Sequence, residues 1–197
     1  MEKRILLAFL LSTFVLVCIH NGLLPPISLW GEILQISKEF KDYERKGGTN
    51  SYILIDKSER FLEVYLNQTR IAKYPVVFGM EPEGFKLREG DMKTPEGVYR
   101  ILSVSDHSEW GKFIWLDYPN AKDWRRHLIA KIKGKIPLFA RIGGEVGIHG
   151  VPYGEDFLIT NKKDWTLGCV SLKREDVNHL TRLLSTLDKE IPVIIKP

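Results

Sequence analysis

The sequence predicts a mostly β fold: a β-rich, sandwich-like or barrel-like domain with one or two covering helices. From residue 52 onwards, short runs of alternating apolar and polar residues are separated by polar turns, and only two later segments show helical spacing. The chain has 197 residues, of which 44% are hydrophobic and 27% charged. This composition is that of an ordinary globular domain, and it excludes collagen-like, low-complexity and multi-pass membrane proteins.

The first 24 residues have the layout of an export signal. Lys3 and Arg4 precede an apolar run of 15 residues, Ile5 to Ile19, which contains Cys18. The run is shorter than the ~20 residues that usually span a bilayer, and no cleavage site of small residues follows it. Val17 is too large for the position before a lipidated cysteine. We therefore expect a signal anchor rather than a cleaved signal peptide, although both interpretations stay open.

Residues 25–50 are predicted to join this segment to the folded domain. Residues 30–40 have loose helical spacing, and the charged, glycine-containing stretch at 41–50 is typical of a linker. The domain itself is predicted to span residues 51–197. It opens with three strands at 52–56, 61–66 and 71–78, which polar turns join into an antiparallel meander.

The remaining elements follow from the same patterns. Two amphipathic helices are predicted at 121–133 and 174–187, the first inserted between strands. Further strands are predicted at 98–104, 112–116, 138–142, 146–149 and 191–195.

The charge and the cysteine content of the chain limit the classes of function that we expect. The formal net charge is only +4 and acidic residues are interspersed with basic ones, so we expect no nucleic-acid partner. No pair of histidines has the spacing of a metal site, and we expect neither a metal nor a cofactor. Outside the N-terminal segment Cys169 is the single cysteine. In an exported domain, such a thiol indicates an intermolecular bridge or a reactive group.

A histidine precedes this cysteine by 20 residues. His149 ends a strand-like run and is followed by Gly150, while Gly168 comes immediately before Cys169. A cysteine attacks as thiolate, and a neighbouring imidazole can either take its proton or hold the thiolate as an ion pair. Glycine beside both residues leaves room around the imidazole and lets a substrate carbonyl approach backbone N–H groups.

These residues resemble the L,D-transpeptidase catalytic domain family, also called YkuD. The specific elements are His149-Gly150 and Thr166-Leu167-Gly168-Cys169-Val170. The segment Gly90 to Tyr99, with its Thr-Pro-Glu-Gly, and the opening strands from Tyr52 to Gly79 are also similar to the family pattern. The resemblance covers about residues 51 to 196. It implies a β-rich enzyme outside the cytoplasm that acts on peptidoglycan.

In that family a cysteine attacks the bond between the third residue and D-Ala of a stem peptide, and D-Ala leaves a thioester behind. The resemblance implies Cys169 as nucleophile and His149 as base. It also implies the backbone N–H groups of Gly168 and Cys169 as oxyanion donors. The candidate substrate-binding residues are Gly150, Thr166, Trp165 and Ser171. The expected partners are donor and acceptor stem peptides, together with the membrane through the N-terminal segment.

Two positions depart from the family pattern. Leu167 stands where many members have His, and Ser171 stands where many have Arg. The charge of that arginine is missing unless another base supplies it, and the candidates are Arg141, Lys173 and Arg174. The acceptor therefore stays open, and the alternatives are a hydrolytic enzyme, a sortase-like cysteine enzyme and a catalytically silent wall-binding module.

Overall fold

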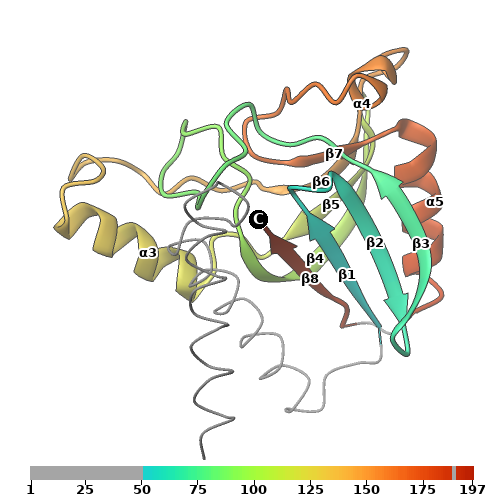
Figure 1. Cartoon of the computed structure of the whole chain (residues 1–197), viewed down its shortest axis with the longest axis horizontal. Coiled ribbons are helices and arrows are strands. Elements are labelled where there is room, and N and C mark those ends of the chain that lie inside the picture. Colours follow the sequence, from blue (N-terminus) through green and yellow to red (C-terminus); the bar gives the residue numbers. More distant parts are fainter. Residues whose placement is uncertain (1–50, 188–189) are drawn as a thin grey trace, which may run out of the picture.

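The computed structural model describes residues 51–187 and 190–197, and it is built on one mixed sheet of eight strands (Figure 1). The strand order across the sheet is β3-β2-β1-β8-β4-β5-β6-β7. The strands are β1 (Ser51–Asp56), β2 (Phe61–Leu66), β3 (Thr69–Pro75), β4 (Gly97–His107), β5 (Gly111–Leu116), β6 (Gly147–Gly150), β7 (Val170–Leu172) and β8 (Pro192–Lys196). The predicted mostly β fold is confirmed.

The predicted meander is confirmed, since β1 pairs with β2 and β2 with β3, both antiparallel. The chain then returns at its end, because β8 inserts between β1 and β4 and runs parallel to β1. Alternation places Ile53 and Ile55 fully inside, and Val193 and Ile195 of the neighbouring strand pack with them in the main core. The alternation of apolar and polar residues along these strands thus decides which face of the first half of the sheet is buried.

The sheet curls toward a barrel. Strand β4 belongs to both halves, pairing with β8 near its start and with β5 along the rest of its length. The segment after β3 then reaches across to the opposite end of the sheet, where Val77 bridges Ser171 and Gly79 bridges Thr166. These bridges bring the opening strands against the segment that carries the cysteine.

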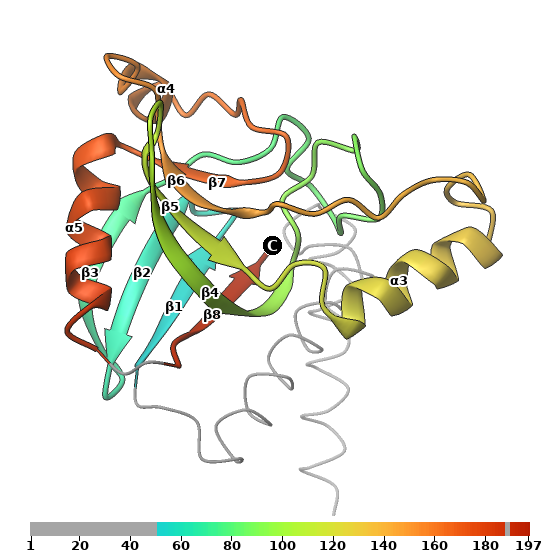
Figure 2. The ribbon, with the colours of Figure 1, turned by 180° about the vertical axis from the view of Figure 1, so that it is seen from behind.

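The helices are α3 (Ala121–Ile132), α4 (Phe157–Thr160) and α5 (Arg174–Leu184). Helix α5 packs on β5 and β6 and buries Val177, Leu180 and Leu184. Helix α3 and the loop after it project away from the sheet, which both views show (Figures 1 and 2). The two predicted helices are confirmed; α5 ends three residues earlier than expected, and the short α4 is additional.

One predicted strand is wrong. Residues 138–142 form an irregular loop after α3, although their apolar character is typical of a buried strand. A turn in which the Ala140 N–H donates to the Pro137 carbonyl starts this loop, and Leu138 and Phe139 are exposed. A strand needs a neighbouring strand to pair with its backbone groups, whereas here the Arg141 carbonyl accepts from the N–H of Glu89, which lies in a loop. Conversely, β7 was not predicted as a strand.

The predicted N-terminal anchor, juxtamembrane helix and linker lie outside the described residues. Within residues 51–187 and 190–197, none of the helices has the length and apolar character needed to cross a membrane.

Candidate active site

His149 lies on β6 and packs against two aromatic side chains, which come from β5 and the turn before it. The antiparallel register of β5 and β6 pairs Phe113 with His149, and the two rings stack with centroids 5.5 Å apart. Trp110 stacks on the imidazole with a centroid distance of 4.3 Å. A Cβ on Gly147 would lie 2.2 Å from the Phe113 ring, so glycine is required there. The imidazole is therefore held in one plane and is only 1% exposed.

The hydrogen bond of this imidazole defines its tautomer. His149 Nδ1 lies 2.8 Å from the carbonyl oxygen of Gly150. Because a carbonyl oxygen only accepts, Nδ1 carries the proton, and Nε2 is the nitrogen that can accept another. Burial lowers the pKa of His149 to about 4, although the Gly150 carbonyl opposes that shift. The resting imidazole is thus neutral and able to act as a base near neutral pH.

Cys169 lies at the end of the turn that leads into β7, which runs parallel to β6. Its thiol donates a hydrogen bond to the carbonyl oxygen of Glu145, with Sγ 3.5 Å from that oxygen. Burial raises the pKa of the Cys169 thiol to about 11, against the opposing effects of the Gly147 N–H and the Lys86 charge. The resting pair is therefore a neutral thiol and a neutral imidazole. The geometry favours proton transfer during attack over a preformed ion pair.

Thr166 shapes the turn that presents the cysteine. Its hydroxyl donates to the carbonyl oxygen of Cys169 over 2.7 Å and accepts from the Gly168 N–H over 3.1 Å. Gly168 has φ 145°, and a Cβ there would lie 2.8 Å from the carbonyl oxygen of Lys93. Both residues thus stabilise the conformation of the turn, and the buried Thr166 hydroxyl already makes its hydrogen bonds within that turn.

The same hydrogen bonds separate the two predicted oxyanion donors. The Gly168 N–H already donates to Thr166, so the geometry does not favour it as a donor to substrate. Within the part of the chain that the structure describes, no acceptor is bonded to the Cys169 N–H. The Cys169 N–H is therefore the better candidate for stabilising a developing oxyanion.

Of the three other predicted substrate-binding residues, Gly150 and Ser171 are buried, whereas Trp165 lines the pocket. Gly150 is buried, and a Cβ there would lie 2.5 Å from the carbonyl oxygen of Trp110. Ser171 is 0% exposed on β7, and its hydroxyl has no hydrogen-bond partner among the described residues. Both residues are buried in this structure, and a contact of either with substrate stays a prediction. Trp165 lines the pocket and packs edge-on against His149 with centroids 5.6 Å apart, so it forms a wall of the site.

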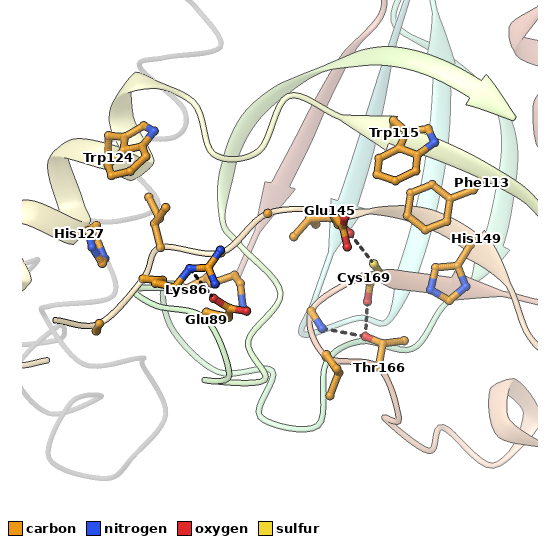
Figure 3. A pocket seen from close by; sticks show the side chains of 18 of the residues that line it. Lys86, Glu89, Phe113, Trp115, Trp124, His127, Glu145, His149, Thr166 and Cys169 are labelled. Carbon is orange, nitrogen blue, oxygen red and sulfur yellow. Dashed lines mark hydrogen bonds and ion pairs between the residues drawn. The ribbon is translucent and has the colours of Figure 1, made fainter. Parts of the chain in front are cut away.

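His149 and Cys169 lie at one end of a pocket of about 1310 Å³ (Figure 3). Lys86 is a buried cation of this pocket, paired with Asp91 at 2.8 Å. Arg141 also lines the pocket and lies 3.5 Å from Glu89. The two other candidates for the missing arginine charge lie outside the lining: Lys173 occupies the N-cap position of α5, and Arg174 donates to the carbonyl oxygen of Glu109.

Sequence reasoning did not assign the residues that frame the pair. These residues are Phe113, Trp110, Lys86 and Glu145, none of which belongs to the motifs around His149 and Cys169. The sequence places both aromatics near one turn, but only the register of β5 against β6 shows that Phe113 packs on His149. Among the described residues, no group of three His, Cys, Asp or Glu side chains could hold a metal ion.

Comparison with known proteins gives the family of this chain. YafK of Escherichia coli strain K12, whose naming as an L,D-transpeptidase is provisional, is 33% identical over 129 residues. The match covers 59% of this chain and 48% of YafK, so the chain spans about half the length of the curated relatives it matches.

Solved structures agree on the fold. The helical cell shape determining protein Pgp2 of Campylobacter jejuni superposes with a TM-score of 0.55 at 24% identity, covering 74% of this chain and 46% of that one. Bd1075 of Bdellovibrio bacteriovorus has a TM-score of 0.50 at 22% identity, with 75% and 48% covered. The family model of the L,D-transpeptidase catalytic domain, YkuD, matches residues 50–195. The resemblance inferred from the motifs is thus confirmed, and the chain belongs to the L,D-transpeptidase catalytic domain family.

Proposed function

We propose that this chain is a cysteine-dependent acyltransferase that acts on peptidoglycan stem peptides. One observation carries the proposal: a buried, neutral His149 has its Nδ1 proton committed to the Gly150 carbonyl, and it shares one end of the pocket with Cys169. An imidazole in this state can accept a proton only at Nε2, which is the requirement for a general base that activates a thiol.

The acylation step follows from these groups. The Cys169 sulfur attacks the carbonyl carbon between the third residue and D-Ala, and the thiol proton passes to Nε2 of His149. The carbonyl oxygen becomes an oxyanion, which the Cys169 N–H can stabilise. His149 then returns the proton to the amine of D-Ala as the C–N bond breaks, which leaves a thioester on Cys169. An acceptor amine completes a cross-link, whereas water completes hydrolysis.

The charges in the pocket support this class of substrate. Its lining combines the cations Lys86 and Arg141 with the carboxylates Glu89 and Glu145. The diamino acid of a stem peptide carries both an amine and a carboxylate, and a lining of mixed sign can pair with both. Lys86 is the buried cation among these, so we propose that it supplies the positive charge that the family pattern places at Ser171.

The substrate also bears on where the enzyme works. Stem peptides lie outside the cytoplasmic membrane, and the export layout of residues 1–24 fits that location. We therefore propose an extracytoplasmic enzyme in cell wall cross-linking or remodelling, held at the membrane by its N-terminal segment.

The decisive experiment incubates the purified full chain with diaminopimelate-containing tetrapeptide stems and measures release of D-Ala by mass spectrometry. The wild type should release D-Ala and the Cys169→Ala variant should not. Absence of release by the wild type, or equal release by the variant, would overturn the proposal. Adding a second stem as acceptor separates the reactions, because a cross-linked dimer indicates transpeptidation and the free tripeptide alone indicates hydrolysis.

A further inference from the structure

A projecting arm, residues 121–140, consists of α3 and the first part of the loop that follows it. Both views show α3 and its loop extending away from the curled sheet (Figures 1 and 2). Only one face of the helix is buried, through Asp123, His127 and Ala130. The arm therefore presents most of its surface outwards, and the sheet does not need that surface for its own core.

Positive charge concentrates on this arm. It contains six basic residues, namely Lys122, Arg125, Arg126, Lys131, Lys133 and Lys135. Asp123 is its single acidic residue, so the arm has a formal charge of +5 whereas the whole chain has +4. That carboxylate is only 2% exposed and accepts hydrogen bonds from the Asn120 N–H and the Tyr99 hydroxyl. The negative charge is thus turned inwards, and the outer surface of the arm is basic.

Large apolar side chains are exposed between these charges. On the helix, Leu128 is 52% exposed and Ile132 is 83% exposed, and their i, i+4 spacing places them on one stripe. In the loop, Leu138 is 76% exposed and Phe139 is 89% exposed. Soluble surfaces rarely gather so many large apolar side chains, and such a gathering marks an interaction site.

We propose that the arm is an interfacial docking surface for an anionic lipid bilayer. Exposed aliphatic and aromatic side chains that alternate with lysines are the pattern of segments that insert into the headgroup region of a membrane. A protein partner fits less well, because lysine is depleted at protein interfaces and here Lys131, Lys133 and Lys135 are interleaved in the sequence with the exposed apolar residues. The apolar residues enter the headgroup layer and the lysines bind its phosphates.

Docking in this way also orients the active site. Trp124, His127 and Lys131 lie on α3 and line the same pocket as Cys169. The pocket therefore lies along the side of the arm, and a bilayer bound by Leu128, Ile132 and the loop would hold the pocket close to the membrane surface. This inference does not depend on the proposed acyl transfer, since it concerns binding alone.

The test uses the full chain and a local probe, because the N-terminal apolar run could bind vesicles by itself. In a chain with Cys18 and Cys169 replaced by serine, Leu138→Cys carries an environment-sensitive fluorophore. Tyr153→Cys, at a residue that is 90% exposed and outside the arm, is the matched control. Each labelled chain is reconstituted into phosphatidylcholine vesicles with and without phosphatidylglycerol.

The probe at 138 should shift to the blue only in vesicles that contain phosphatidylglycerol, and the probe at 153 should not shift. Changing Lys131, Lys133 and Lys135 to Gln should lower the equilibrium constant for insertion of the arm into the bilayer on the order of 100-fold. Each lysine near an anionic surface raises that constant about fivefold. Changing Lys162 and Lys163 to Gln, two exposed lysines elsewhere, should have no effect.

Three results would overturn the proposal. Equal emission at 138 and 153 in every vesicle would show that the arm stays in water. A blue-shifted probe at 138 before any vesicle is added would show that another part of the chain or a second copy covers the arm, and dependence on protein concentration separates these two. A shift that does not depend on phosphatidylglycerol would exclude the role of the lysines.

Discussion

The protonation state of the catalytic pair can be read from the alkylation rate of Cys169. With the thiol pKa raised by burial to about 11 and that of His149 lowered by burial to about 4, both groups are neutral between these values. Two routes then lead to alkylation. Free thiolate reacts at a rate that rises about tenfold per pH unit, whereas attack assisted by His149 is independent of pH while the imidazole stays neutral.

The magnitudes follow from the pKa of Cys169. At pH 10 about one thiol in ten is ionised, and at pH 6 about one in 10⁵ is. In His149→Ala, alkylation by iodoacetamide should therefore fall on the order of 10⁴-fold from pH 10 to pH 6. The alkylation rate of the wild type should fall less over this range, because attack assisted by His149 continues at a rate that does not depend on pH. The two chains should differ markedly at pH 6 to 7 and converge near pH 10.

The assay measures alkylation of the peptide that contains Cys169 by mass spectrometry, and the peptide that contains Cys18 is resolved separately. Equal rates in the wild type and His149→Ala at pH 6 would remove His149 from the role of base. A wild-type rate at pH 7 that already equals the rate of the fully ionised thiol in His149→Ala above its pKa would refute the neutral pair, because it would show a thiolate already formed as an ion pair.

Three further outcomes are expected. Gly168→Ala should cost about 1–3 kcal/mol in urea unfolding and abolish turnover, because its φ of 145° and the 2.8 Å approach to the Lys93 carbonyl oxygen both oppose a side chain. Gly154→Ala, where φ is 82° and nothing lies within 4 Å, should cost less and keep turnover. Trp110→Leu should lower kcat at least about tenfold with little change in KM, and Trp110→Phe should restore most of it, since an aromatic ring holds His149 in its plane. Acid should destabilise the fold, because His149 binds its proton near pH 6.5 when unfolded but only near pH 4 when folded. The free energy of unfolding therefore decreases by up to about 3 kcal/mol as the pH falls from 6.5 to 4. In His149→Gln this part of the pH dependence of the free energy of unfolding should disappear.

Much of the fold could be predicted from local pattern. The meander from Ser51 to Pro75 and the helix from Arg174 are confirmed, because strand alternation and the helical stripe are each contained within one short segment. The segment 138–142 shows the limit of such reasoning. Its apolar composition is typical of a strand, but whether a neighbouring strand exists to pair with it depends on residues far away in the chain.

The active site divides in the same way. Spacing and glycine placement pointed to His149 and Cys169, and the motif around them indicated the family before any fold was known. Burial and pairing could not be derived from spacing. Ser171 was expected to meet substrate, yet the bridge to Val77 and the parallel pairing with His149 place it inside the sheet.

The sequence alone determined the opening meander, the helix from Arg174, the candidate nucleophile and base, and the family. Tertiary structure decided the chemistry of that pair. The register of β5 against β6 places Phe113 on the His149 ring, the Gly150 carbonyl selects its tautomer, and burial keeps Cys169 and His149 neutral. A pattern of residue types is a short-range property of the chain, whereas the pKa of a buried group depends on every element packed around it.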